Sequence, residues 1–171
     1  MIYFELEKFK VLPVQMKKNK SVSMRYHRDV DIRVDGERHA GITIKGDKIL
    51  LVHRIKDGYE YYVFPGGHRR KEENGEETVI RETYEEAGIE VKNPVLAFDF
   101  RNYVKMTVDF YYLCTWKSGE EPRLIGEELD ADPAIDLFDP MWMDVKEVEN
   151  LNILPKFAKN WLEQYLEDKE K

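Results

Sequence analysis

The sequence predicts an α/β (α+β) fold in a single globular domain, and three observations support this. The chain has 171 residues, of which 42% are apolar, which is enough for one domain with its own core. Short alternating stretches separated by glycine turns predict strands between residues 40 and 116. Two further stretches, 74–88 and 154–168, repeat apolar residues every three or four positions, which is typical of amphipathic helices.

Composition excludes several classes of protein. The net charge of -7 argues against a general nucleic-acid-binding surface, because phosphate binding needs clustered Lys and Arg. The single cysteine, Cys114, excludes an internal disulfide framework and fits a reducing compartment. No apolar run approaches the roughly 18 residues needed to span a membrane, and the opening MIYFELEKFK has charges where a signal peptide needs an apolar centre. We therefore expect a soluble, cytoplasmic protein with no membrane partner.

The first part of the chain, 1–36, is predicted to be an N-terminal extension whose strands pack on the main domain, 37–171. Apolar and polar residues alternate at 2–6 and 30–34, as in short strands. A basic cluster at 25–28 is either an arm that faces a substrate or partner, or a solvated turn. The usual fate of charge runs favours the turn.

From residue 40 the strand pattern is clearer. The stretches AGITIK and KILLVHRI, joined by Gly-Asp, predict a β-hairpin. A second turn at 56–58 leads into another strand, YEYYVF. The sequence FPGG then ends this strand, and its glycines allow a ligand to approach the backbone because no side chain intervenes. Phe64, Gly66 and Gly67 are therefore the candidate substrate-binding residues.

The stretch after these glycines predicts a helix with clear ends. Asn74 is the expected N-cap, and Glu77, three residues later, completes a capping box. Gly88 ends the helix where a left-handed conformation is favoured. The residues expected to face the core are Val79, Ile80, Thr83 and Ala87.

Three carboxylates crowd together on the expected surface of this helix. Glu82, Glu85 and Glu86 are separated by one to four positions, and like charges at such spacing destabilise a helix by roughly 0.2–0.5 kcal/mol per pair. A bound divalent cation offsets that repulsion. Arg81 is four residues from both Glu77 and Glu85, so it can pair with either. The alternative is an acidic helix face that is simply solvated.

The stretch from Gly67 to Ile89 resembles the Nudix box, G-x5-E-x7-R-E-U-x-E-E-x-G-U, where U is apolar. Thr83 departs from the pattern at one U position, a mild loss of packing because Thr keeps one methyl. The resemblance implies the MutT-like Nudix fold, in which a mixed sheet is sandwiched between helices and the box forms a loop–helix–loop. The fixed positions are occupied by Gly67, Glu73, Arg81, Glu82, Glu85, Glu86, Gly88 and Ile89.

The resemblance implies Mg²⁺-dependent hydrolysis of a nucleoside diphosphate linked to another group (NDP-X), with Mn²⁺ as an alternative ion. Arg81 orients the carboxylates, and the general base is Glu82 or a glutamate from 120–128. Glu73 is either a metal ligand or an acceptor beside the ligands. An all-oxygen carboxylate site suits Mg²⁺. The implied metal ligands are Glu82, Glu85, Glu86, Glu73 and the backbone carbonyl of Gly67.

A long acidic stretch at 117–140 is predicted to be a loop, and loops of this length are usually functional or mobile. The family often supplies a further acidic ligand or base from this region. Glu127 and Glu128 are the candidate catalytic residues here, with Glu120 and Glu121 as second choices. A plain disordered acidic loop remains an equal alternative. Asp132 and Phe138 are the candidates for contacting the organic part of a substrate.

The remaining elements complete the expected core. The strand TVDFYYLCTW at 107–116 places alternate residues on one face, where they fill the core or stack a base. Cys114 in this strand is expected to be a buried, inert thiol. MWMDV at 141–145 predicts a last strand, and 154–168 predicts a helix that docks on the sheet, with a dimer contact as the alternative.

The substrate is less defined than the reaction. Neither the proline typical of ADP-ribose hydrolases nor the tyrosine typical of diadenosine polyphosphate hydrolases occurs downstream, where Met106 and Thr107 stand. A nucleoside triphosphate is therefore the default among small nucleotide-type diphosphate substrates. A non-catalytic module on a Nudix fold, which senses a nucleotide or serves as an interaction domain, is the alternative. Such sensors often lose glutamates of the box, and this chain keeps them all, which favours an enzyme.

Overall fold

The computed structural model describes residues 36–102, 107–125 and 136–169, so the predicted strands within 1–35 lie outside it. Over the described residues the chain forms a seven-stranded sheet whose main path runs β3-β2-β1-β6-β5. β4 pairs with β1, and β7 pairs with β2. β1 and β6 are parallel and the other pairs are antiparallel, so the sheet is mixed. The strands are β1 (Gly36–Lys45), β2 (Lys48–Lys56), β3 (Tyr59–Val63), β4 (Gly66–His68), β5 (Glu90–Asn102), β6 (Thr107–Ser118) and β7 (Asp136–Asp144).

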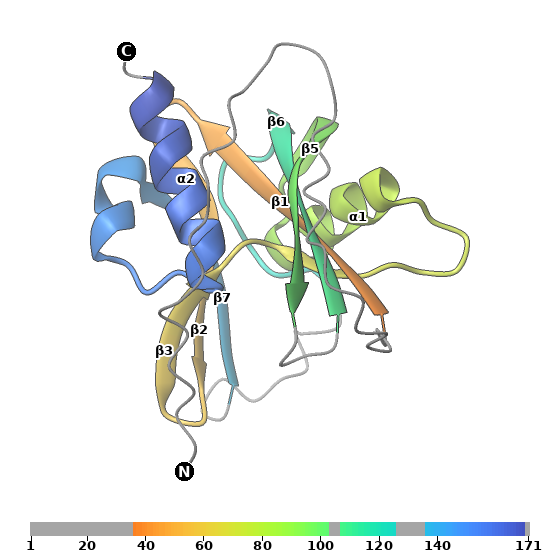
Figure 1. The fold of residues 1–171 in the computed structure, drawn as a ribbon, viewed down its shortest axis with the longest axis horizontal. Coiled ribbons are helices and arrows are strands. Elements are labelled where there is room, and N and C mark those ends of the chain that lie inside the picture. Colours follow the sequence, from red (N-terminus) through yellow and green to blue (C-terminus); the bar gives the residue numbers. More distant parts are fainter. Residues whose placement is uncertain (1–35, 103–106, 126–135, 170–171) are drawn as a thin grey trace, which may run out of the picture.

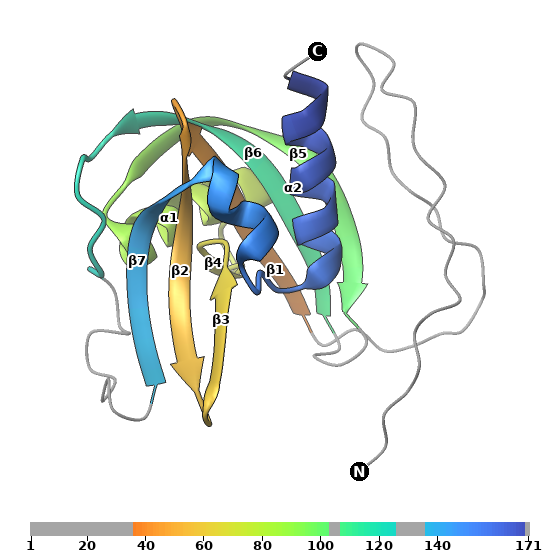
Figure 2. The same cartoon turned by 90° about the vertical axis from the view of Figure 1, so that its left-hand side faces the viewer.

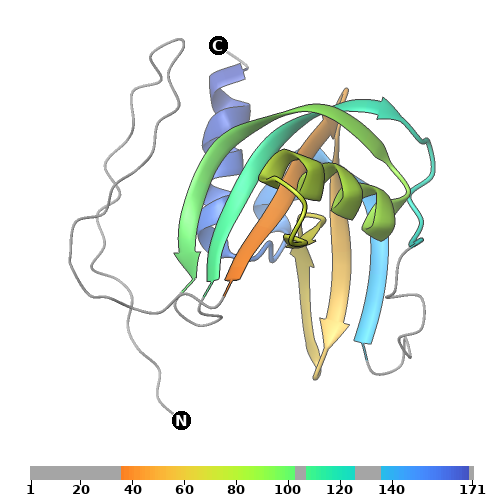
Figure 3. The same cartoon turned by 90° about the vertical axis from the view of Figure 1, so that its right-hand side faces the viewer.

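Helices cover both faces of this sheet. α1 (Gly75–Ala87) lies against one face and α2 (Lys156–Lys169) against the other, as Figures 1, 2 and 3 show from three sides. A 3₁₀ helix, η2 (Val145–Asn150), links β7 to the α2 side. The predicted mixed sheet between helices is therefore confirmed, as are both hairpins and both α-helices.

Two apolar cores lie on the two faces, and β6 contributes to both. Tyr112 and Cys114 belong to the core beneath α1, and Tyr111 belongs to the core beneath α2, as the period-2 alternation of a strand requires. Phe64 also belongs to the α2 core. Its side chain is 1% exposed and meets Tyr111 edge-on, with ring centroids 6.0 Å apart. The prediction that Phe64 contacts a substrate is therefore wrong for its side chain, because the core encloses it.

The last strand is longer than the sequence predicts. β7 begins at Asp136, five residues before the predicted start, and pairs with β2 along its whole length. Pro140 lies inside it, opposite Val52, which is tolerated because β7 has a single strand partner and is an edge strand. Phe138 is also in this strand, and the guanidinium of Arg54 covers its ring at 4.3 Å. The predicted 117–140 loop is shortened accordingly.

The C-terminal helix docks as predicted. Ala158 and Leu162 of α2 are fully buried, and Phe157 and Trp161 pack edge-on and tilted against Phe98 of β5. This apolar face is covered by the chain's own sheet. No helix in the described ranges has the length and apolarity needed to cross a bilayer.

Candidate active site

The helix α1 has both ends that the sequence predicts. The Asn74 side chain accepts from the Glu77 backbone N–H at 2.9 Å, and the Glu77 carboxylate accepts from the Asn74 N–H at 2.8 Å. Gly88 adopts the left-handed conformation with φ 65°, and its N–H donates to Tyr84 O at 2.8 Å. The capping box and the glycine stop are therefore confirmed, and they determine where the box helix begins and ends.

The buried face of α1 differs in part from the prediction. Val79, Thr83 and Ala87 are fully buried, but Ile80 is 39% exposed, so its predicted core position is wrong. Two glutamates are buried instead: Glu82 is 8% exposed and Glu86 is 7% exposed. The helix turns this face toward β1 and β4, whose backbone gives a carboxylate a polar partner that an isoleucine cannot use. The carboxylates thus lie at the helix–sheet junction rather than on an open surface.

The paired glycines of β4 form the wall that these carboxylates contact. Gly66 N donates to Glu86 Oε2 at 2.7 Å. A Cβ atom added to Gly67 would lie 2.5 Å from both carboxylate oxygens of Glu82, and one added to Gly66 would collide with the carbonyl oxygen of His39. Gly66 therefore needs glycine because backbone occupies the space of a side chain, and Gly67 leaves the Glu82 carboxylate room to lie against the strand. The structure brings Gly66, Gly67, Glu82 and Glu86 together.

Arg81 is the centre of the arrangement that we call the carboxylate cluster, formed by Glu73, Glu82, Glu85 and Glu86. Its Nε and Nη2 donate to the two oxygens of Glu73 at 2.5 and 2.9 Å. Its Nη1 donates to Glu82 Oε1 at 2.6 Å and to Glu85 Oε2 at 2.8 Å. The predicted partner Glu85 is confirmed, while Glu77 serves the capping box. The arginine side chain is 15% exposed, so these bonds are largely shielded from water.

Glu73 is fully engaged by its neighbours. Hydrogen bonds from Arg81 lower the pKa of Glu73 to about 2, with smaller contributions from the Arg70 backbone and the Thr78 hydroxyl, against a smaller opposing effect of burial. The same contact with Glu73 raises the pKa of Arg81. Both Glu73 oxygens accept from Arg81. Of the two roles predicted for Glu73, this geometry favours the acceptor that holds Arg81 over the metal ligand.

The donor chemistry of the site suits a hard divalent cation. The remaining groups, the carboxylates of Glu82, Glu85 and Glu86 and the Gly67 backbone, offer oxygen only, the preference of Mg²⁺. In the described part of the chain, no three His, Cys, Asp or Glu side chains converge on one metal position. Arg81 draws Glu82 and Glu85 to itself. The oxygen donors of these residues fit such an ion in chemistry, although their side chains point to protein partners.

The acidic stretch reaches the site at the end of α1. Arg123 N donates to Ala87 O at 2.9 Å, and Ile125 N donates to Glu85 O at 2.8 Å, so this segment satisfies carbonyls at the helix C-terminus. Glu120 instead forms an ion pair with Lys45. Glu121 is exposed. The candidates Glu127, Glu128 and Asp132 lie outside the described residues.

A buried pair beneath the start of α1 is missed by sequence reasoning. His39 Nδ1 lies 3.3 Å from the Tyr112 hydroxyl, and the His39 ring stacks on Phe110 at 5.0 Å between centroids. Burial, the largest cause, lowers the pKa of His39. A Cβ atom on Gly75 would collide with the Tyr112 hydroxyl. The sequence signals this packing only through Gly75. Proline is favoured in the first turn of a helix, and a glycine there indicates that other side chains approach the backbone closely.

Comparison with known proteins agrees with this geometry. A model of the NUDIX domain matches residues 36–165. The chain belongs to the Nudix family. Two curated relatives, both from strains of Mycobacterium tuberculosis and both named "Putative 8-oxo-dGTP diphosphatase 3", are 30% identical over 120 residues. That alignment covers 66% of this chain and 52% of each relative, so the chain spans about half the length of the curated relatives it matches.

Solved Nudix structures have the same fold. A NUDIX hydrolase from Nitrosomonas europaea is 19% identical with a TM-score of 0.61, and the match covers 78% of this chain and 90% of that one. The MutT protein from Bacillus halodurans is 25% identical with a TM-score of 0.56, and the match covers 75% and 80%. These similarities support the Nudix fold for the described sheet and helices.

Proposed function

We propose that this Nudix chain is a pyrophosphohydrolase that uses Mg²⁺ to cleave a phosphoanhydride bond in a nucleoside diphosphate derivative. One observation carries the proposal: Glu82 and Glu86 are buried against the Gly66–Gly67 backbone within a cluster of four carboxylates. Burying charged groups costs free energy unless they are paired or coordinate a metal. Among the described residues, two guanidinium groups, Arg81 and Arg70, contact carboxylates of this cluster.

Each group has a proposed role. Glu82, Glu85 and Glu86, with the Gly67 carbonyl, hold the ion, which when bound neutralises phosphate charge and lowers the pKa of a water. Arg81 positions Glu82 and Glu85 through one nitrogen, Nη1. Its other two nitrogens remain on Glu73 and keep the guanidinium plane in place. Mn²⁺ is the proposed substitute for Mg²⁺.

The proposed general base comes from Glu127, Glu128 or Glu82. Ile125 is tied by its amide to the Glu85 carbonyl, and Glu127 and Glu128 follow it by two and three residues in the chain. Their closeness in sequence to this anchor is the ground on which they are proposed. The pH profiles of kcat for Glu127→Gln, Glu128→Gln and Glu82→Gln, compared one at a time, identify which of the three accepts the proton.

A nucleoside triphosphate is the proposed substrate class. The name of the Mycobacterium tuberculosis relatives makes 8-oxo-dGTP a specific candidate within it. The test is a panel of nucleoside triphosphates including 8-oxo-dGTP, nucleotide sugars, ADP-ribose and dinucleotides, incubated with Mg²⁺ or Mn²⁺ and scored for phosphate products. Metal-dependent release of a monophosphate supports the proposal. Binding of a nucleotide with no product from any substrate identifies the non-catalytic sensor instead.

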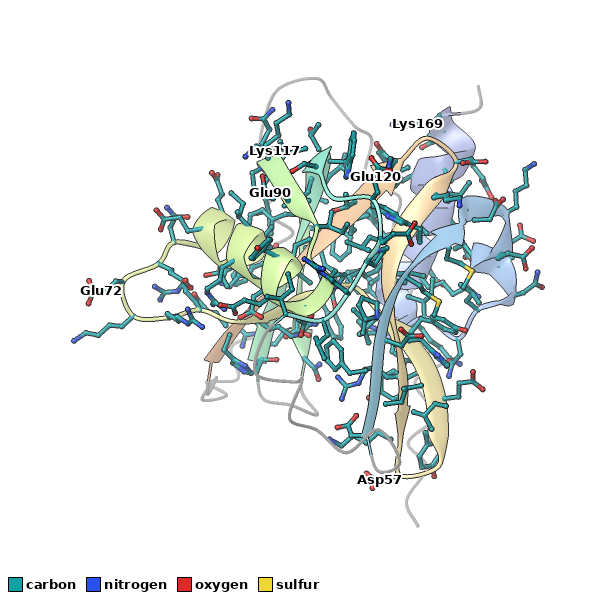
Figure 4. The ribbon with its side chains drawn as sticks, turned by 180° about the vertical axis from the view of Figure 1, so that it is seen from behind. Asp57, Glu72, Glu90, Lys117, Glu120 and Lys169 are labelled. Atoms are coloured by element: carbon teal, nitrogen blue, oxygen red, sulfur yellow. The ribbon has the colours of Figure 1, made fainter. Side chains whose placement is uncertain are left out.

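A charge-matched pair of variants tests the site assignment. Glu86→Gln is expected to lower kcat by at least about a hundredfold, as for loss of a group that stabilises the transition state. The amide oxygen of the new side chain can still accept from Gly66 N, so the fold is expected to survive, which a melting curve checks. Glu72→Gln is the control, since Glu72 projects from the outer end of the β4–α1 loop (Figure 4). Equal turnover in the two variants contradicts the assignment.

A further inference from the structure

The loop between β4 and α1 carries a second cation toward the carboxylate cluster. Arg70 Nη2 lies 3.2 Å from Glu85 Oε1 and 3.5 Å from Oε2. The Arg70 side chain is 57% exposed, whereas that of Arg81, on the same glutamate, is 15% exposed. Glu85 therefore lies between a shielded guanidinium and an exposed one.

The backbone of Arg70 is held more firmly than its side chain. Arg70 N donates to Glu73 Oε2 at 3.1 Å, and Glu73 N donates back to Arg70 O at 3.1 Å. Because Glu73 is itself fixed by Arg81, the Arg70 backbone is tied to the same acceptor that positions the cluster. The side chain is an exposed ion pair, which contributes about 0–1 kcal/mol and is readily exchanged.

We propose that Arg70 is a phosphate-binding residue: its guanidinium leaves Glu85 and binds the diphosphate of the substrate. This inference rests on the proposed function. A divalent ion held by Glu85 would draw on the same carboxylate that Arg70 contacts and would repel the positive charge of Arg70, so ion binding weakens this exposed ion pair and releases the guanidinium. The freed group lies beside the ion, and its planar fork suits two phosphate oxygens. Arg70 thus competes with the incoming ion and assists the nucleotide once the ion is bound.

The chain offers a matched control in the next residue. Lys71 is exposed in the same loop and carries the same charge, and no ion pair joins it to another described residue. Lys71→Ala therefore changes the net charge of the loop by the same amount as Arg70→Ala. A difference in binding between the two variants therefore reports the position of the Arg70 guanidinium, because the loss of charge is the same in both.

The experiment measures binding of two probes to the full chain by titration calorimetry. The first probe is Mn²⁺ alone, and the second is the α,β-methylene analogue of dGTP in the presence of Mn²⁺. Arg70→Ala is expected to bind Mn²⁺ about two- to fivefold more tightly, because a competitor for Glu85 is gone. The same variant is expected to bind the analogue about tenfold more weakly, which corresponds to about 1.4 kcal/mol. Lys71→Ala should stay within about twofold of the wild-type chain for both probes, and Arg70→Lys should recover part of the loss.

These opposite signs separate the proposal from a structural role. If Arg70→Ala weakens binding of both probes, the residue only supports the loop and the proposal fails. If Arg70→Ala and Lys71→Ala bind the analogue equally, the effect is a general field and the proposal fails as well. If the wild-type chain binds no Mn²⁺, the proposed function is overturned and the role of Arg70 with it. A wild-type chain that binds both probes keeps the proposed function whatever Arg70 does.

Discussion

The carboxylate cluster around Arg81 and the ion-pair cluster around Asp136 are both built from carboxylates and cationic side chains, but in opposite proportions. In the first, Arg81 and Arg70 pair with Glu73, Glu82 and Glu85, and the fourth carboxylate, that of Glu86, accepts from Gly66 N. In the second, Asp136 of β7 accepts from Arg54 at 2.6 Å and from Lys56 at 2.7 Å, both on β2. Among the described residues, carboxylates outnumber cations in the Arg81 cluster, and cations outnumber the single carboxylate in the Asp136 cluster.

This difference separates a binding site from a structural link. The Asp136 cluster satisfies its one carboxylate completely and joins two neighbouring strands, so no negative charge remains for a ligand. The carboxylate cluster instead gathers four carboxylates, two of them buried, around two guanidinium groups of the described residues. Such an arrangement is costly unless a further cation is available, which is the physical basis of the proposed metal site.

The largest expected effect is the loss of Arg81. Arg81→Ala leaves three carboxylates facing one another without their shared donor, and we expect a loss of about 3 kcal/mol in the free energy of unfolding. Arg54→Ala should cost about 1 kcal/mol, because it leaves one carboxylate that still has Lys56. Urea denaturation of the two variants measures both values. Equal losses of unfolding free energy in the two variants would contradict the view that Arg81 stabilises more carboxylates than Arg54 does.

An intermediate effect is expected from divalent ions. At about ten times its dissociation constant, Mn²⁺ should stabilise the wild-type chain by about 1.4 kcal/mol, which raises the melting temperature by about 3–6 °C. Asp136→Asn should show the same shift, since its cluster offers no surplus carboxylate. Glu82→Gln should show a smaller one. Thermal melts across an Mn²⁺ series provide the measurement, and a shift that depends on Asp136 argues against the proposed location.

The smallest expected effect concerns acid stability at Asp136. Hydrogen bonding to Lys56, the first cause, and to Arg54 lowers the pKa of Asp136 from its ordinary value of 3.8. A carboxyl whose pKa is lower when folded stabilises the fold above the unfolded value and loses that contribution as the pH falls through the folded one. Asp136→Asn should therefore cost about 1 kcal/mol at neutral pH and less below pH 3.8.

Glu73 provides the comparison for this acid titration. Its pKa of about 2 lies further below the ordinary value of 4.5, so its contribution should fade over pH 4.5 to about 2. Unfolding free energies of Asp136→Asn and Glu73→Gln, measured from neutral pH down to about pH 2, test both signs. A larger pH dependence for Asp136 would contradict the view that the carboxylate cluster is the more tightly coupled of the two.

Local interactions made part of the site predictable. The capping box between Asn74 and Glu77 and the left-handed stop at Gly88 involve residues within a few positions of one another, so the sequence contains everything needed to infer them. The Arg81–Glu85 pair is likewise one helical turn apart. The strand alternation of β6 follows from backbone geometry alone.

Long-range contacts made the rest unpredictable. Ile80 and Glu82 both fit a helix, and the approach of β4 decides that Glu82 is buried and Ile80 exposed. Phe64 stands beside the glycines in sequence, yet the strand direction turns it into the opposite core. β7 extends to Asp136 because β2 offers it a partner, which no pattern within 117–140 reveals.

By itself, the sequence determined the box helix, its limits and its set of charges, because these depend on spacing along one element. The tertiary structure alone decided which carboxylates contact the glycine backbone. It also decided that both oxygens of Glu73 accept from Arg81 and that the exposed Arg70 pairs with Glu85. Those contacts join residues on separate elements whose relative position is set by packing on the sheet, and packing is not encoded in any single stretch of the chain.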